Sequence, residues 1–358
     1  MKLTKNGILR IYQRSFTDNA YRVKCNFNCS YCISNNMKVK QISFNKYHFQ
    51  QTKLIWDNLS KLDDQILAQV NFHGEFLVDK WGRKCAFYIN KIPNVKVFEI
   101  LTNNSVSPKT YLNEMDIKKS VFLCSFHPDS ITLEKYINHC IQIKEAGGTV
   151  FSGLVFRPQI IKNIRKIHLL LKKNHIPLIL QPFHTFGFKY YGKQYPQDYT
   201  EKERQLLKKY INYEEYHHYA VDLQKTIGLD CYAGVDSIQL FLDGTVRRCF
   251  TGNIGSPSKK KVGIKNLINT KFGLKINDFL RNNIIRNLIA KIEMRYHNDT
   301  SIFDLLSGRV RLAEKPYPCH TYSCFSNTLF MHLNEFRKKY PFPEYLIDNY
   351  ELLTIKDF

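Results

Sequence analysis

The sequence predicts an α/β fold in which parallel strands form a partial (β/α)6 TIM-like barrel. Three observations support this prediction. Apolar runs of strand length alternate with segments of helical periodicity about six times between residues 19 and 227. Polar residues follow the apolar runs, at the strand ends where a parallel barrel places its chemistry. After residue 228 the pattern changes to a small cysteine-rich extension with a β-hairpin.

Most of the predicted strands are short apolar runs that end at polar or turn residues, and the segment 19–24 is predicted as a short strand that runs into the cysteine loop. The run QILAQVNF, for example, ends at His73-Gly74-Glu75. Strands that alternate with helices form parallel sheets, and right-handed crossovers allow such a sheet to curl into a barrel. The predicted strands span residues 19–24, 65–72, 95–101, 121–126, 149–156 and 176–180.

The predicted helices have apolar residues at helical spacing and recognisable ends. Gly147-Gly148 ends one helix, because glycine readily adopts the left-handed cap conformation, and Pro158 begins the next. The predicted helices span residues 44–62, 81–91, 108–118, 132–146, 158–174 and 200–227. The hairpin is predicted from Ser237 to Arg248, with Asp243-Gly244 as its turn.

Composition predicts a globular, cytoplasmic protein without a membrane segment. The 358 residues are 44% hydrophobic, which is enough to bury a sizeable core. There is no apolar run of membrane length and no signal-like N-terminus. The net charge is +22, and residues 259–295 contain ten Lys or Arg but two acids. This segment is either a contact site for a polyanion or a solvated basic face.

Three of the ten cysteines form the motif CxxxCxxC: Cys25, Cys29 and Cys32. Three thiolates on a short loop can bind three irons of a four-iron cluster and leave the fourth iron open. Zinc is the alternative, but it would need a fourth protein ligand. Three further cysteines stand singly in apolar segments and are predicted to be small buried side chains: Cys85, Cys124 and Cys140.

This motif, placed after the first predicted strand of a β/α chain, resembles that of the radical S-adenosylmethionine superfamily. The resemblance implies that Cys25, Cys29 and Cys32 hold a [4Fe-4S] cluster whose open iron binds S-adenosylmethionine. In that family, reduction of the cluster cleaves the cofactor to a 5′-deoxyadenosyl radical, which abstracts a hydrogen atom from the substrate. The resemblance therefore implies an enzyme that receives electrons from a donor such as flavodoxin or ferredoxin.

The same resemblance implies a set of residues that bind S-adenosylmethionine. Tyr31 matches an aromatic position near the adenine. Gly74 and Glu75 match the end of a Gly-Gly-Glu motif that binds the amino group of the cofactor, although His73 replaces its first glycine. Ser125 is expected near the ribose or carboxylate, and Arg157 is expected to pair with the carboxylate.

A second set of cysteines follows the barrel: Cys231, Cys249, Cys319 and Cys324. The first two flank the predicted hairpin, and four thiolates suit a closed iron–sulfur cluster or a structural zinc. The arrangement resembles the SPASM and twitch extensions of the same superfamily, and four cysteines match the single-cluster twitch form. The resemblance implies a second, auxiliary [4Fe-4S] cluster that relays or accepts an electron. The spacing of the last two cysteines departs from the common pattern.

The expected division of the chain is an N-terminal segment at 1–18, the barrel at 19–227, the extension with its basic insertion at 228–325, and a helical tail at 326–358. The resemblance leaves the substrate open between a peptide and a small molecule, and it implies an oxidation or another modification of that substrate. The net charge of +22 leaves two alternatives open: an RNA-modifying enzyme of the same superfamily, and an iron–sulfur protein that binds nucleic acid without catalysis.

Overall fold

The computed structural model describes residues 1–15, 21–36, 39–210, 214–226, 228–249, 300–308 and 311–319. Three sequence-based expectations fall outside these residues. They are the basic segment 259–295, the helical tail 326–358 and Cys324. In the part that is described, no helix is both long and apolar enough to cross a membrane.

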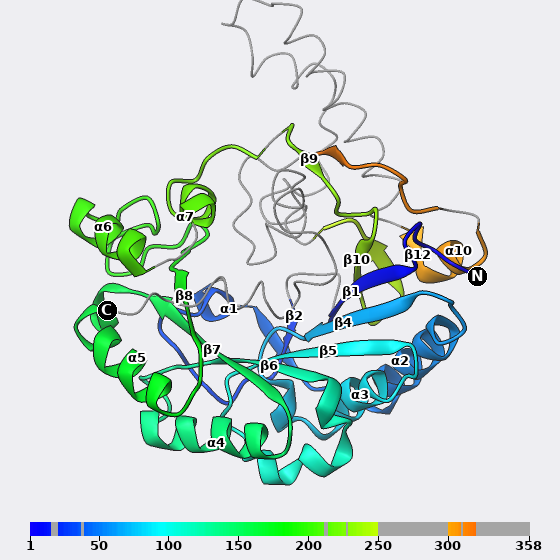
Figure 1. Ribbon diagram of the computed structural model, residues 1–358, viewed down its shortest axis with the longest axis horizontal. Coiled ribbons are helices and arrows are strands. Elements are labelled where there is room, and N and C mark those ends of the chain that lie inside the picture. Colours follow the sequence, from blue (N-terminus) through cyan, green and yellow to red (C-terminus); the bar gives the residue numbers. More distant parts are fainter. Residues whose placement is uncertain are drawn as a thin grey trace, which may run out of the picture.

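A large, mainly parallel sheet organises the chain (Figure 1). Six of its strands run parallel and follow one another in sequence order, which confirms the predicted α/β class. Among the described strands, β8 and β12 form the two edges, so the sheet is open. The six parallel strands are β1 (Ile8–Arg14), β4 (Gln65–Asn71), β5 (Val95–Thr102), β6 (Ser120–Ser125), β7 (Thr149–Phe156) and β8 (Leu178–Pro182).

The prediction of the first strand was wrong. The expected strand at 19–24 corresponds to β2 (Tyr21–Val23), which pairs with β3 (Lys40–Ile42) in a separate two-stranded sheet. The main sheet instead begins with β1, inside the expected N-terminal segment. Strand β1 has polar residues on both faces, and its buried Arg10 pairs with Glu99 of β5. An apolar pattern therefore does not reveal it.

Four helices cover the outer face of the curved sheet (Figure 1). They pack through buried apolar residues such as Trp56, Leu59 and Ile89. Burial of each such side chain contributes about 1.5–3 kcal/mol to stability. The four helices are α2 (Lys46–Leu59), α3 (Lys80–Asn90), α4 (Leu133–Glu145) and α5 (Ile164–Lys173).

Two helical predictions need correction. The helix expected at 108–118 consists of three separate 3-10 turns, η2 (Pro108–Thr110), η3 (Leu112–Glu114) and η4 (Ile117–Lys119). The helix expected at 200–227 ends at Ala220 instead: its described parts are α6 (Glu201–Tyr210) and α7 (Glu214–Ala220). Helix α7 ends early, and Leu223 beyond it has φ 54°, which a right-handed helix does not allow.

Short elements complete the carboxyl-terminal side of the barrel. Helix α1 (Ile33–Asn36) follows the cysteine loop, η1 (Phe76–Val78) follows Glu75, and η5 (Pro158–Asn163) precedes α5.

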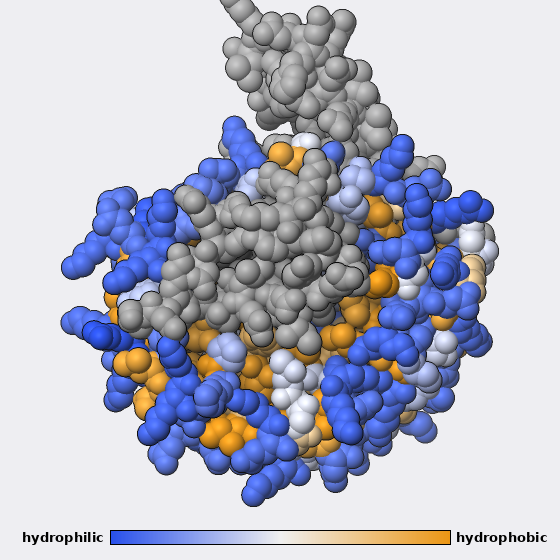
Figure 2. Space-filling model, viewed as in Figure 1, coloured by the Kyte–Doolittle hydropathy of each residue, from blue (hydrophilic) through white to orange (hydrophobic). Residues whose placement is uncertain are grey.

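Hydrophilic residues cover the rim of the molecule, and hydrophobic residues gather near the middle of the visible face (Figure 2).

The predicted hairpin is present and extends the main sheet. Strand β10 (Ser237–Leu240) pairs antiparallel with β11 (Thr245–Arg247), and Gly244 takes φ 84° in the turn between them. Strand β10 also pairs in parallel with β1. Strand β11 pairs with β12 (Thr300–Ser301), which leads into α10 (Ile302–Leu306). The hairpin is thus continuous with the barrel sheet.

Candidate functional site

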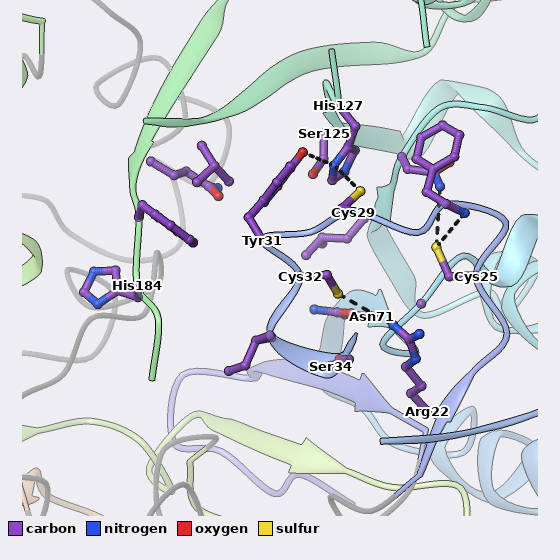
Figure 3. A pocket seen from close by; sticks show the side chains of 18 of the residues that line it. Arg22, Cys25, Cys29, Tyr31, Cys32, Ser34, Asn71, Ser125, His127 and His184 are labelled. Carbon is purple, nitrogen blue, oxygen red and sulfur yellow. Dashed lines mark hydrogen bonds between the residues drawn. The ribbon is translucent and has the colours of Figure 1, made fainter. Parts of the chain in front are cut away.

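A cavity of about 400 Å³ lies at the carboxyl ends of the parallel strands (Figure 3). Residues from the last or next-to-last position of each of five strands line it: Asn71, Thr102, Ser125, Val155 and Gln181. The cysteine loop and the segment after β8 complete its wall. This is the edge at which a barrel of parallel strands places its functional groups.

All three cysteines of the CxxxCxxC motif line this cavity. Side-chain amides fix the loop that bears them. Asn36 donates hydrogen bonds to the carbonyl oxygens of Ser30 and Cys32, at 2.8 and 2.9 Å, and Asn35 donates to the carbonyl oxygen of Cys29 at 3.1 Å. Two asparagine side chains in the helical turn after the loop therefore fix the backbone of the cysteine loop.

Each of the three sulfur atoms has a polar neighbour. The Cys25 Sγ lies 3.5 Å from the backbone N of Phe27 and 3.8 Å from Nδ2 of Asn103. The Cys29 Sγ lies 3.5 Å from Nδ1 of His127. Burial raises the pKa of the Cys25 and Cys29 thiols above the usual value.

The third cysteine has a charged neighbour. Nη1 of Arg22 lies 3.6 Å from the Cys32 Sγ (Figure 3). Among the described residues, no three His, Cys, Asp or Glu side chains converge on a position for a single metal ion. The three thiols are instead spread around one cavity.

Tyr31 lines the cavity and belongs to a stack of three side chains. Its hydroxyl oxygen lies 2.7 Å from Nδ1 of His127, and the two rings are parallel with centroids 5.9 Å apart. The Arg157 guanidinium lies over the Tyr31 ring, 4.1 Å from its centroid. Burial, and then the charge of Arg157, lowers the pKa of His127 to about 4. His127 is thus held as a neutral ring.

Arg157 lies behind Tyr31 and is not among the residues that line the cavity. It is buried, and its Nη2 forms an ion pair with Oδ2 of Asp129 at 2.6 Å. Its Nη1 lies 3.3 Å from the hydroxyl oxygen of Tyr190. The guanidinium expected to meet a cofactor carboxylate is therefore engaged by protein groups.

Gly74 lines the cavity in a conformation that only glycine can adopt. Its φ is 121°, and a Cβ atom there would lie 2.1 Å from the carbonyl oxygen of Val23. The close approach is part of a backbone connection in which Val23 N donates to His73 O, at 2.8 Å, and Glu75 N donates to Lys24 O, at 3.2 Å. These bonds attach the start of the cysteine loop to the end of β4.

Glu75 is fully buried and does not line the cavity. Its carboxylate accepts hydrogen bonds from Leu77 N at 3.2 Å, from Thr102 Oγ1 at 2.9 Å and from Asn103 N at 2.5 Å. Burial raises its pKa from 4.5 to about 7, although these bonds favour the charged form. The carboxylate therefore connects the ends of β4 and β5 from behind the cavity wall.

Sequence reasoning did not assign a role to several residues of the cavity. Arg22, Asn71, Asn103 and His184 line it, and His184 lies across the cavity from the cysteine loop (Figure 3). Burial lowers the pKa of His184 to about 4. Position at a strand end was the available signal for Asn71 and Asn103. Arg22 gave no such signal, because its contact with Cys32 depends on the tertiary fold.

Three cysteines of the second set are described, and Cys249 and Cys319 each lie close enough to Cys231 to affect the pKa of its thiol. Cys231 belongs to β9 (Asp230–Cys231), which pairs with β13 (Tyr317–Pro318), and Cys319 N donates to Leu229 O at 2.6 Å. Burial raises the pKa of the Cys231 thiol to about 12, with smaller contributions from Cys319 and Cys249 in the same direction. The fourth member, Cys324, lies outside the described residues.

No protein-family model matches the sequence, and no match was found among curated proteins. Solved structures do match. SuiB of Streptococcus suis, bound to its precursor peptide SuiA, is 12% identical over 68% of this chain and 59% of its own, with a TM-score of 0.46. The chain thus spans about three fifths of the length of SuiB. SuiB has also been solved bound to S-adenosylmethionine.

Two other matches have similar identities. The protein anSMEcpe, with bound AdoMet and the Cp18Cys peptide, is 13% identical over 68% of this chain and 74% of its own, with a TM-score of 0.44. BtrN, in complex with AdoMet and 2-DOIA, is 14% identical over the same shares of the two chains, with a TM-score of 0.33.

Proposed function

We propose that the chain is a radical S-adenosylmethionine enzyme. The observation on which this rests is that Cys25, Cys29 and Cys32 line one cavity at the carboxyl ends of five of the six parallel strands. When bound there, a [4Fe-4S] cluster with one open iron supplies reductive cleavage of S-adenosylmethionine to a 5′-deoxyadenosyl radical, which abstracts a hydrogen atom from the substrate.

The donor set of the cavity fits such a cluster. Thiolates are the usual protein ligands of iron–sulfur clusters, and hydrogen bonds to sulfur stabilise their negative charge. Each of the three cysteine sulfurs has a polar neighbour within 3.8 Å. A structural zinc would need a fourth protein ligand, which the three-cysteine motif does not supply.

The cavity wall next to the cysteines provides the proposed cofactor site. Gly74 presents bare backbone at the cavity, and backbone carbonyl groups are suitable acceptors for an ammonium group. Ser125 provides a hydroxyl group, and Tyr31 provides an aromatic ring for the adenine. Glu75 and Arg157 act indirectly in this proposal, because Glu75 holds the 102–103 backbone and Arg157 supports the Tyr31 ring.

We further propose a second [4Fe-4S] cluster on Cys231, Cys249, Cys319 and Cys324. Its support is the proximity of the first three thiols and the backbone pairing of β9 with β13. A cluster with four protein ligands has no open iron, so its suitable role is to relay or accept an electron. The extension that holds it is of the twitch type in this proposal and follows the barrel from about residue 228.

The substrate is proposed to be a peptide or a small molecule, and the electron donor a cytoplasmic flavodoxin or ferredoxin. The reaction is proposed to be an oxidation or another modification at a carbon–hydrogen bond. Mixing the reconstituted protein with cell extract separated by size tests the substrate class. A peptide substrate predicts that the peptide fraction increases 5′-deoxyadenosine formation, whereas a small-molecule substrate predicts this effect for the low-mass fraction.

The enzyme assignment is tested by anaerobic reconstitution with iron and sulfide, followed by reduction in the presence of S-adenosylmethionine. The parent protein is expected to release 5′-deoxyadenosine. Cys25→Ala, Cys29→Ala and Cys32→Ala are each expected to lose about four irons per chain and all cofactor cleavage. Cys85→Ala is the matched control, because Cys85 is buried in α3 away from the cavity. It is expected to keep both.

Cofactor cleavage that persists in any of the three motif variants would contradict the assignment. So would a parent protein that binds its iron and S-adenosylmethionine in full but forms no 5′-deoxyadenosine.

A further inference from the structure

Arg22 is a buried cation at the wall of the cavity. It belongs to β2, directly before the cysteine loop, and only 3% of its surface is exposed. Its Nη1 lies 3.6 Å from the Cys32 Sγ, and its Nη2 donates to the side-chain oxygen of Asn35. These contacts direct the guanidinium toward the third cysteine of the motif (Figure 3).

One donor of this guanidinium is unpaired in the part of the chain that the structure describes. The Arg22 Nε atom is buried and has no hydrogen-bond partner among the described residues. An unpaired buried donor is costly, and native proteins satisfy most such groups. Since Arg22 lines the cavity, a group bound within it is the available acceptor.

The other polar neighbours of the motif sulfurs are not guanidinium or ammonium groups, unlike Arg22. Cys25 meets a backbone amide and the amide of Asn103, and Cys29 meets the ring of His127 and the hydroxyl of Ser130. Arg22, in contrast, presents a guanidinium, a positively charged group, to Cys32. The positive charge is thus placed on one side of the motif, at Cys32.

We propose that Arg22 sets the reduction potential of the cluster held by Cys25, Cys29 and Cys32. This inference rests on the proposed function. Reduction adds one electron, and thus one negative charge, from the flavodoxin or ferredoxin. A fixed positive charge in contact with a ligand sulfur stabilises the more negative form more strongly, and burial strengthens the effect. Arg22 therefore raises the potential and makes the cluster easier to reduce.

The test is a redox titration of the reconstituted protein, followed by electron paramagnetic resonance. The signal of the cluster with the open iron is identified by its change when S-adenosylmethionine is added. Arg22→Gln is expected to lower the reduction equilibrium constant about tenfold, which is about 59 mV for one electron. Arg22→Lys keeps the charge and is expected to remain within about threefold of the parent, which is about 30 mV.

The matched control is Arg204→Gln, because Arg204 contacts backbone carbonyls and Asp222 away from the cavity. Its potential is expected to equal that of the parent. If Arg22→Gln binds too little iron for a titration, the reduction potential of Arg22→Lys is the deciding measurement. A potential close to that of the parent supports the inference. An Arg22→Gln potential equal to that of the parent overturns it. An Arg22→Lys potential lowered about tenfold, or an Arg22→Lys protein without iron, also overturns it.

Failure of the proposed function is recognised separately. In that case the parent protein itself lacks iron at Cys25, Cys29 and Cys32 or cleaves no S-adenosylmethionine. Failure of the inference about Arg22 is seen in the variants while the parent behaves as expected.

Discussion

Glu75→Gln changes how stability depends on pH, because the Glu75 carboxyl is fully buried. Its pKa rises from 4.5 to about 7 on folding, so the folded protein binds its proton more tightly than the unfolded chain does. The stability that comes from this proton is fully present below about pH 4.5. It is lost as pH rises toward and through about 7.

The magnitude follows from the two pKa values. A change from 4.5 to about 7 corresponds to about 3 kcal/mol in the free energy of unfolding. The parent is therefore expected to lose about 2–3 kcal/mol more than Glu75→Gln does between pH 5 and pH 8, because glutamine does not titrate. Glu75→Gln also loses an acceptor for Thr102 or Asn103, at a pH-independent cost of about 1–3 kcal/mol.

Urea unfolding at several pH values measures this difference. Glu134→Gln is the control, since Glu134 is an exposed acid in the first turn of α4. It is expected to follow the pH dependence of the parent. Parallel stability curves for the parent and Glu75→Gln would refute the argument, and so would a parent that gains stability relative to Glu75→Gln from pH 5 to pH 8.

Three further predictions concern the cavity and the second cysteine set. Gly74→Ala is expected to reduce iron binding severely and to cost several kcal/mol of stability, because its Cβ would lie 2.1 Å from Val23 O. Gly153→Ala is the control, since the nearest atom to a Cβ there would be 3.8 Å away. Iron content and urea unfolding check both variants. Tyr31→Phe keeps the ring below Arg157 and is expected to weaken S-adenosylmethionine binding less than about tenfold, whereas Tyr31→Leu weakens it more, as measured by calorimetry; equal losses would argue against a role for the ring. Cys231→Ser is expected to lower iron by at most about four per chain and to leave the signal of the first cluster unchanged, and unaltered iron content would remove the second cluster from the proposal.

Much of the barrel could be predicted from the sequence because its strands are locally apolar. Strands β4 to β8 have apolar runs and polar ends, so their existence and order follow from pattern alone. Strand β1 does not. Its Arg10 pairs with Glu99, 89 residues away, and its Arg14 bonds Gln239, 225 residues away. Partners so distant in sequence give no local signal, so the strand that starts the sheet was not predicted.

The candidate site, too, could be predicted only in part. The motif cysteines were expected at the rim of the barrel and line the cavity there, and so does Ser125, which was expected at the end of a strand. Glu75 and Arg157 were also expected at strand ends; Arg157 directly follows β7, whereas Glu75 lies four residues after β4. Their charges, however, are engaged by Asn103 and Thr102 in one case and by Asp129 in the other. The sequence pattern predicts the position of a residue along a strand. It does not predict which residues of other elements form hydrogen bonds or ion pairs with its side chain.

The parallel pairing of β10 with β1 joins the strand before Cys249 to the barrel sheet. Cys249 follows β11 by two residues, and β11 is joined through β10 and β1 to β4. The start of the cysteine loop is in turn bonded to the end of β4 through Val23 and Glu75. A continuous ladder of backbone hydrogen bonds thus runs from the start of the cysteine loop to the strand before Cys249. Cys231 lies outside this ladder, in the separate pairing of β9 with β13. A motion that separated β11 from the start of the cysteine loop would first have to open the ladder.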